Sequence, residues 1–175
     1  MKHILVAVDG SDHARRALDL ASDIAQKYDA GLVLVHVVGS EPLSDDVRHL
    51  ADVEFGALLP KTAPSLPQMR IADRVGGVGE FLADQDARVA AIKKLLGERI
   101  LESAGERARE RGVKDVKTVL RQGDPASAIL AAAADCKANL VVVGSRGRSN
   151  LKSLMLGSVS HKVNNLSPVN VITVR

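Results

Sequence analysis

The sequence predicts an α/β protein with a single doubly wound parallel sheet and helices on both of its faces. Short, continuous apolar runs recur along the chain, segments with helical periodicity separate them, and acidic or glycine-containing turns follow several of the runs. A continuous apolar run is typical of a parallel strand, because crossover helices bury both faces of such a sheet. The chain has 175 residues, 46% of them hydrophobic, which suffices for one well-buried core, so we expect one domain over residues 1–175.

The first half of the predicted sheet rests on two apolar runs. Residues 4–8 form the first run, which ends at Asp9, and Ser11 then has the position of a helix N-cap. Apolar residues over 14–28 recur at helical spacing and give that helix one apolar stripe. Residues 32–38 form the second run. The pattern predicts a strand, a helix and a second, parallel strand.

The same alternation resumes in the second half of the chain. A long amphipathic helix is predicted over residues 89–108 and ends at Gly112. Asp124 followed by Pro125 is typical of a helix start, with an N-cap and a proline in the first turn. The other predicted elements are strands over 116–120, 140–143 and 169–174 and helices over 126–137 and 157–166. This alternation implies right-handed βαβ units, whose ligands bind at the carboxyl ends of the strands, where the strand order reverses.

Residues 40–80 interrupt the regular alternation. They hold four of the six prolines and a glycine cluster at 76–79. Connections in compact domains are usually about 4–6 residues long, so we expect an irregular insertion, with one short amphipathic helix over residues 43–55. Two interpretations of this insertion stay open, an exposed excursion without a role in function and a lid or partner-docking element.

Composition argues against several classes of protein. The net charge of +3 is compatible with nucleic-acid binding, but the three aromatic residues are scattered and offer no stacking platform, so we expect no nucleic-acid partner. Cys136 is the only cysteine, which excludes an intrachain disulfide and favours a reducing compartment; we interpret it as a small core residue. No apolar run approaches membrane-spanning length, so we expect a cytoplasmic protein without membrane insertion.

The strongest candidate for a binding site is the loop after the fourth predicted strand. Two residues separate Gly144 from Gly147, nine separate Gly147 from Gly157, and Ser158 follows. A missing side chain at Gly144 would let a ligand approach the backbone, and Gly147 would permit a turn with positive φ. The helix that opens near Gly157 would present its N–H groups to an anion such as a phosphate chain.

Side chains of the same loop add to this hypothesis. Arg146, Arg148 and Lys152 would provide positive charge, and the hydroxyls of Ser158 and Ser160 would hold phosphate oxygens. Glycines and serines also mark ordinary loops, so the spacing alone leaves open a glycine-bearing loop followed by a capped helix.

Two further positions at the strand ends are candidates. Asp9 could bind ribose hydroxyls or help to place Mg²⁺, although Asp9 or Ser11 could equally do no more than cap the next helix. Val37, at the end of the second strand, could line an adenine pocket or belong to the core. His36 lies within that strand, and we interpret it as a satisfied buried histidine rather than a catalyst.

Motifs of several enzyme classes are missing from the sequence. It contains no Gly-x-Ser-x-Gly elbow, no His-Glu-x-x-His and no Walker loop, and its five histidines lack metal-ligand spacing. The dinucleotide fingerprint belongs in the first strand–helix turn, where this chain has only Gly10. Any nucleotide site must therefore depend on the late glycine loop.

With these motifs the sequence resembles the universal stress protein family. The likeness covers nearly the whole chain except the residues around 40–80, and it includes residues 2–11, the His36–Val37 pair and the C-terminal strand. Its most specific element is the motif Gly-x2-Gly-x9-Gly-Ser/Thr, which the late loop satisfies in full and which marks the ATP-binding branch of that family. The resemblance implies a Rossmann-like sheet of five strands in the order 3-2-1-4-5.

The resemblance also implies which residues bind ATP with Mg²⁺. Asp9 would contact the nucleotide and is the candidate Mg²⁺ ligand. Ala7 and Val8 would line the pocket for base and sugar, and Val37 would contact adenine. The residues implied around the ribose and phosphates are Val143, Gly144, Arg146, Gly147, Gly157, Ser158, Val159 and Ser160.

Partners and function follow from the same resemblance. It implies homodimers built through the last strand, where Val169, Val171, Ile172 and Val174 would otherwise leave an apolar edge open to uncontrolled pairing. We expect a cytoplasmic, ATP-binding stress-response module that acts through nucleotide-dependent contacts with another protein, with ATP hydrolysis at most slow. The alternatives are a slow ATPase or nucleotidyl-transfer enzyme, a module that binds AMP or a cyclic nucleotide, and a structural dimer whose insertion docks a partner.

Overall fold

A computed structural model describes residues 2–40, 71–147 and 156–175, together with 42, 43, 47, 49 and 53. Residues 1–40 and 97–175 form one compact unit, and residues 41–96 form another. The first unit holds the whole sheet. The single domain expected over residues 1–175 stays a prediction.

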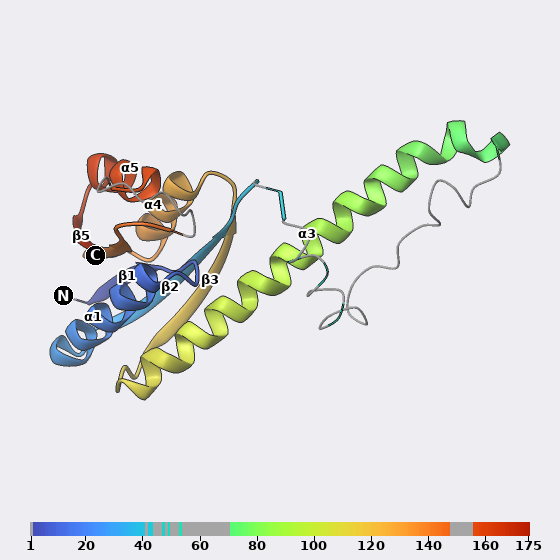
Figure 1. Cartoon of the computed structure of the whole chain (residues 1–175). Coiled ribbons are helices and arrows are strands. Elements are labelled where there is room, and N and C mark those ends of the chain that lie inside the picture. Colours follow the sequence, from blue (N-terminus) through green and yellow to red (C-terminus); the bar gives the residue numbers. More distant parts are fainter. Residues whose placement is uncertain are drawn as a thin grey trace. The chain divides into compact units, whose positions relative to one another are not determined.

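The first unit is built on a five-stranded sheet with the order β3-β2-β1-β4-β5 (Figure 1). The strands are β1 (His3–Ala7), β2 (Gly31–Val38), β3 (Val116–Gln122), β4 (Leu140–Gly144) and β5 (Asn170–Val174). Every neighbouring pair is parallel. The α/β fold and the strand order implied by the resemblance are confirmed, and each predicted strand agrees with the observed one to within two residues at either end.

Helices cover both faces of this sheet. They are α1 (Asp12–Tyr28), α3 (Ile71–Glu110), α4 (Pro125–Asp135) and α5 (Ser158–Leu166). Core residues of α1 and of the C-terminal part of α3 pack with one face, and those of α4 and α5 pack with the other.

Alternate residues of the strands fill these two cores. In β1, Ile4 and Val6 point to the face covered by α1 and α3, whereas Leu5 points to the face covered by α4 and α5. All three are fully buried, as are Val141 and Val142 of β4. Burial on both faces is the reason that the central strands are continuous apolar runs in the sequence.

The predicted helix ends are present as well. The Ser11 hydroxyl accepts a hydrogen bond from the Ala14 N–H at the start of α1, and Asp124 Oδ1 accepts one from the Ser127 N–H at the start of α4. α3 ends at Glu110, two residues before Gly112, where φ is +85°. These ends are local chain features, so the sequence alone was enough to find them.

The start of α3 differs from the prediction. The sequence places this helix from residue 89, but it begins at Ile71, so residues 71–80 are helical and not irregular. The glycines at 76, 77 and 79 suggest a loop, yet each glycine in a helix costs only about 1 kcal/mol, and an existing helix extends by one hydrogen bond per residue. In the second unit Ile92 is buried against Leu43 and its helical neighbours. Of the short helix predicted over residues 43–55, Leu50, Ala51 and Phe55 lie outside the described residues.

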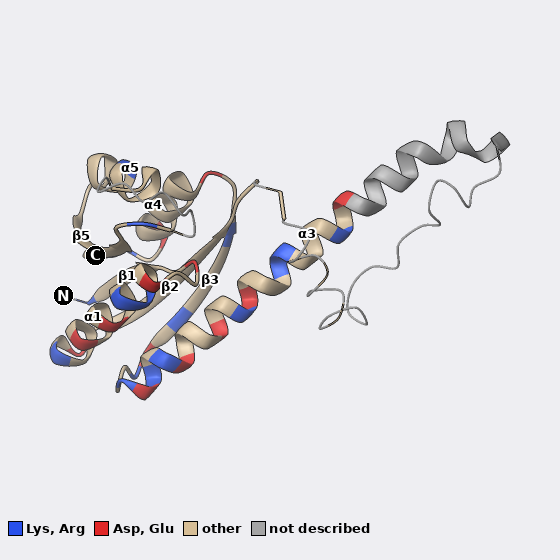
Figure 2. Ribbon diagram, viewed as in Figure 1, with Lys and Arg blue, Asp and Glu red and all other residues tan. Residues whose placement is uncertain are grey.

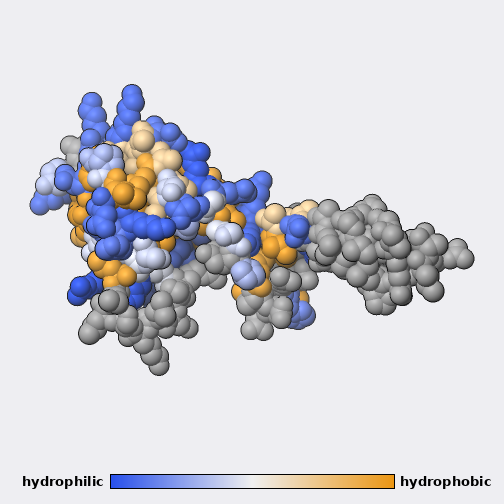
Figure 3. Space-filling model, turned by 90° about the horizontal axis from the view of Figure 1, so that it is seen from above, coloured by the Kyte–Doolittle hydropathy of each residue, from blue (hydrophilic) through white to orange (hydrophobic). Residues whose placement is uncertain are grey.

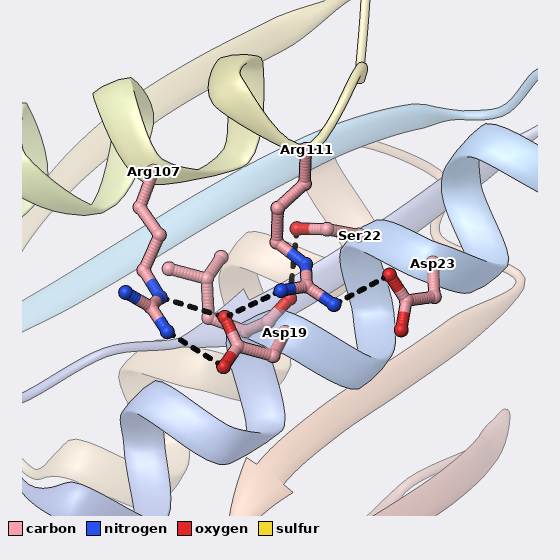
Figure 4. Close-up of polar contacts among 6 residues, drawn as sticks. Asp19, Ser22, Asp23, Arg107 and Arg111 are labelled. Atoms are coloured by element: carbon pink, nitrogen blue, oxygen red, sulfur yellow. Dashed lines mark hydrogen bonds and ion pairs between the residues drawn. The ribbon is translucent and has the colours of Figure 1, made fainter.

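Ion pairs join α1 to the C-terminal part of α3, where charges of both signs alternate along the helices (Figure 2). Arg107 donates two hydrogen bonds to Asp19, from Nε at 2.6 Å and from a terminal nitrogen at 2.8 Å (Figure 4). Arg111 pairs with Asp23 at 2.7 Å and lies 3.7 Å from Asp19. The hydrogen bond from Arg107 lowers the pKa of the Asp19 carboxyl, with the charges of both arginines acting in the same direction and partial burial opposing them.

Hydrophilic side chains cover much of the face of the first unit seen in Figure 3, with smaller apolar areas between them. A search of the described residues for a helix long and apolar enough to cross a membrane finds none.

The lowered pKa of Asp19 predicts how stability depends on pH. Because the folded pKa is below the ordinary 3.8, the stabilisation from ionised Asp19 is fully present above that value and is lost as pH falls through the folded pKa. At pH 7, Asp19→Asn should lower the free energy of unfolding by about 0.5–1 kcal/mol, the range for a partly exposed ion pair. Urea denaturation of both proteins at several pH values measures this difference.

The control is Asp29→Asn, since the pair of Asp29 with Lys114 is 88% and 87% exposed at its two side chains. We expect no loss of stability there. A difference between wild type and Asp19→Asn that persists unchanged at pH 2 contradicts the assignment.

Candidate functional site

The site lies where the chain leaves the two central strands on opposite sides of the sheet. β1 and β4 are neighbours, with Val6 opposite Val142. β1 leads into α1 on one face, whereas β4 leads into α5 on the other face. In an open parallel sheet this reversal creates a crevice beyond the carboxyl ends of the two strands.

Asp9, which follows β1, lies beside Gly147, which follows β4. A Cβ atom placed on Gly147 would be only 2.7 Å from Asp9 Oδ2. The other carboxylate oxygen, Oδ1, accepts a hydrogen bond from the Ser11 N–H at 2.9 Å. Asp9 therefore stabilises the turn before α1 with one oxygen and directs the other towards the glycine loop. The positive φ expected at Gly147 is not observed, and the missing side chain instead leaves room for the carboxylate.

Gly144 has a packing role that the sequence does not predict, while its predicted approach to a ligand stays a prediction. A Cβ atom there would lie 2.9 Å from the Ala14 nitrogen and from the carbonyl carbon and Cβ of His13. The first turn of α1 therefore occupies the space that a side chain at position 144 would need. Gly144 permits the end of β4 to pack directly against α1, which is a tertiary contact that the spacing of glycines does not reveal.

Ser145, which the sequence analysis did not single out, closes the loop. Its N–H donates to the Val174 carbonyl at 2.6 Å, and its own carbonyl accepts hydrogen bonds from the Gly157 N–H at 2.8 Å and the Ser160 hydroxyl at 3.0 Å. The Ser160 hydroxyl, expected at a phosphate, is thus buried among backbone carbonyls, including that of Gly157 at 2.9 Å. The only sequence signal for Ser145 is its place inside the glycine motif.

The N-terminus of α5 is the clearest anion-binding feature of the loop. Gly157 is the N-cap, and it has no side chain with which to cap this helix. The first N–H to bond back along the helix is that of His161, which donates to the Gly157 carbonyl at 3.0 Å. The N–H groups of Ser158, Val159 and Ser160 belong to the first turn, which has no intrahelical acceptors, and the helix dipole makes this end positive.

The apolar candidates divide between the two faces of the sheet. Ala7, Val37 and Val143 lie together on the face covered by α4 and α5. Val8 is buried on the opposite face with α1 and α3, so its side chain cannot line the same pocket. The alternation of β1 residues could have shown this, because Val8 shares the parity of Val6.

The remaining candidates contribute less. Arg146 is half-buried, whereas Arg148 and Lys152 lie outside the described residues. Within the described part of the chain, no group of three or more histidine, cysteine or carboxylate side chains could hold a metal ion. Burial raises the pKa of the Cys136 thiol, which agrees with a structural cysteine.

This chain is similar in sequence and in structure to known proteins of one family. A family model described as the Universal stress protein family matches residues 1–54 and 75–175. Universal stress protein YxiE of Bacillus subtilis (strain 168) is 38% identical over 172 residues, which are 98% of this chain and 97% of the relative. Universal stress protein UspA from Lactobacillus plantarum has a similar structure, with a TM-score of 0.63 and 24% identity, covering 99% of this chain and 97% of that one. A universal stress protein solved in complex with cAMP gives a TM-score of 0.58 and 28% identity, with the same two coverages.

The contact at Gly144 predicts a cost for any side chain there. Gly144→Ala should lower the free energy of unfolding by about 1–3 kcal/mol, the usual range for overpacking, because the methyl group meets the backbone of α1. Urea denaturation measures the loss.

Gly105→Ala is the matched control. A Cβ atom at Gly105 meets the movable guanidinium of Arg109 at 3.3 Å and a methyl of Thr118 at 3.8 Å, so no backbone has to shift. The alanine should be neutral or stabilising within a helix. Equal stability of Gly144→Ala and wild type contradicts the packing role.

Proposed function

This chain belongs to the universal stress protein family, and from that premise we propose that it binds ATP with Mg²⁺ in the crevice between the ends of β1 and β4. The observation that carries the proposal is that a carboxylate and the positive end of a helix dipole both adjoin the glycine loop. Asp9 Oδ2 faces Gly147, and the uncapped N-terminus of α5 follows the same loop. The relative in complex with cAMP supports an adenine nucleotide as the class of ligand.

In this proposal the phosphates bind the backbone N–H groups of Ser158, Val159 and Ser160. The first turn of α5 carries no acidic side chain, so no carboxylate competes with the anion there. Gly157 keeps this turn close to the loop, since a Cβ atom there would be 3.3 Å from the Ser145 carbonyl oxygen. The Ser158 hydroxyl is exposed and free to turn towards a phosphate oxygen.

The base and sugar would lie nearer the sheet. Ala7 and Val37 are partly exposed on one face and would provide an apolar surface for adenine, with the buried Val143 beneath them in the same core. The carboxylate of Asp9 is placed for ribose hydroxyls or for Mg²⁺, and the half-buried Arg146 adds a positive charge beside the loop. The resemblance implies twelve binding positions. At two of them, Val8 and Gly144, we propose that only the backbone contacts the nucleotide.

The position of Asp9 leads us to propose that ATP binds together with Mg²⁺. An unshielded triphosphate that reaches the N-terminus of α5 would pass a carboxylate at the edge of the loop, and like charges at such separations repel. A bound Mg²⁺ reverses this interaction, because the carboxylate then becomes a ligand or a partner of the cation. ATP should bind much more tightly with Mg²⁺ than without it.

The biological role that we propose is a stress-response module whose nucleotide occupancy controls contacts with a protein partner. Asp9 is engaged by Ser11 through one oxygen and faces the loop through the other, which leaves it poorly placed as a general base for water. We therefore propose slow hydrolysis at most. A cytoplasmic location is part of the same proposal.

Isothermal titration calorimetry with purified protein tests the site. Wild type should bind Mg·ATP, and Gly147→Ala should weaken it at least about tenfold, because the added methyl displaces the Asp9 carboxylate. Asp9→Asn should weaken Mg·ATP and reduce the difference between titrations with and without Mg²⁺. Gly105→Ala, far from the loop in sequence and on α3, serves as the unaffected control.

The ligand itself is tested by a competition series with ATP, ADP, AMP and cyclic AMP. Tighter binding of AMP or cyclic AMP than of Mg·ATP would favour the single-phosphate alternative. Multiple-turnover release of phosphate or pyrophosphate that Ser158→Ala abolishes would favour the enzyme alternative. Absence of Mg·ATP binding in the micromolar range contradicts the proposal itself.

We also propose that the protein is a homodimer joined at β5. This strand is an edge of the sheet, and Ile172 and Val174 on one face and Val171 on the other are only half-buried. Pairing two such edges would satisfy their backbone groups and cover these side chains. Sedimentation velocity should show a dimer at micromolar concentration, and a monomer at tens of micromolar contradicts this part of the proposal.

A further inference from the structure

We propose that His36 is a positioning residue for the nucleotide site, because it fixes the peptide plane from which Asp9 extends. The inference rests on the proposed function for its consequence in ligand binding, but its structural content concerns the ligand-free protein. It goes beyond the satisfied buried histidine that the sequence predicts.

The first observation is a hydrogen bond between a side chain of β2 and the end of β1. His36 is 8% exposed, and its Nδ1 lies 2.7 Å from the carbonyl oxygen of Val8. A carbonyl only accepts, so Nδ1 carries the proton and donates it. Val8 directly precedes Asp9, which makes this carbonyl part of the same planar peptide unit as the Asp9 nitrogen and Cα.

The second observation is that the two strands separate at this point. β1 pairs with β2 as far as Ala7 opposite Val35, and the Val8 N–H still donates to the Val35 carbonyl at 2.9 Å. β2 then continues along β3 as far as Val38, whereas the chain after Val8 turns towards α1. The His36 ring bridges the two chains at the place where they diverge, on the side of β1 opposite to β4.

The third observation is that the ring is enclosed on its other side. A Cβ atom on Gly97 of α3 would lie 2.8 Å from His36 Cδ2 and 3.4 Å from Nε2, and also 2.8 Å from a methyl of Leu120. Only a residue without a side chain permits α3 to approach the ring this closely. The contact holds the ring in the orientation that presents Nδ1 to Val8.

These contacts lead directly to Asp9. The peptide plane of Val8 and Asp9 is held by His36 at one end, and the turn that follows is held by the hydrogen bond from the Ser11 N–H to Asp9 Oδ1. With both ends fixed, Oδ2 is directed to Gly147. If the His36 donor is lost, the Val8 carbonyl loses the partner that the described residues give it, so Asp9 should no longer hold one direction.

The test compares His36→Phe with His36→Asn. Phenylalanine fills the space without a donor, whereas the asparagine amide nitrogen is one bond from Cγ, as Nδ1 is, and can still donate to Val8. His36→Phe should weaken Mg·ATP about tenfold, in line with an unsatisfied buried acceptor, and His36→Asn should stay within about threefold of wild type. Calorimetry on folded protein, checked by circular dichroism, gives the affinities.

Nuclear magnetic resonance of the ligand-free protein provides a readout that does not depend on the proposed function. The ¹⁵N shifts of wild-type His36 should show a proton on Nδ1. His36→Phe should move the amide resonances of Asp9, Gly10 and Ser11, and His36→Asn should largely retain them. An Nδ1 without a proton, or unmoved amides together with unchanged affinity in His36→Phe, overturns the inference.

Gly97→Ala provides a second variant that keeps the imidazole and displaces it, so the proposal stays testable if His36→Phe does not fold. It should move the same three amides, whereas Gly105→Ala on the same helix should not. If wild type fails to bind Mg·ATP while the amides respond as expected, the proposed function fails and the positioning role of His36 stands. If ATP binds and neither variant alters the turn, the positioning role fails alone.

Discussion

The burial of β1 on both faces and along both edges is the constraint on which the rest of the structure depends. This strand lies between β2 and β4, and its residues Ile4, Leu5 and Val6 are fully buried. A strand held in this way cannot shift in register without moving its side chains to the opposite cores. The residues that follow β1 therefore begin from a fixed point, and the packing of β1 in the core determines the position of Asp9.

The helix α1, which follows Asp9, contacts both the site and α3. Its first turn packs directly on Gly144, and its later turns are tied to α3 through Asp19, Asp23 and their arginines. The ion pairs are partly exposed, so each contributes little to stability, but together they set the position of α1 along α3. The same helix therefore contributes to stability and to the geometry of the site. A substitution that shifts α1 along α3 can alter the site geometry.

Local signals explain how much of this the sequence could predict. The apolar runs and the caps at Ser11 and Asp124 depend on residues close in the chain, and they predicted the five strands, the starts of α1 and α4 and the fold class correctly. Gly144 and Ser145 act through contacts with α1, α5 and β5, so their roles could not be inferred from spacing. The start of α3 was missed for a different reason, because three glycines are individually unfavourable in a helix but not prohibitive.

The electrostatic arrangement explains why an acidic residue and a helix N-terminus can share one small loop. Asp9 alone would repel a phosphate, and the N-terminus of α5 alone would accept any anion, including phosphate and sulfate. Asp9 lies beside Gly147 and the N-terminus of α5 follows the same loop, so under the proposed function the two groups would favour a ligand with negative charge at one end and a cation or hydroxyl groups at the other. Gly147 is the residue that permits this, since any side chain there would meet the carboxylate before the ligand did. In that case, selectivity for a metal-bound nucleotide over a simple anion would arise because the Asp9 carboxylate and the positive N-terminus of α5 both lie close to the backbone of the glycine loop.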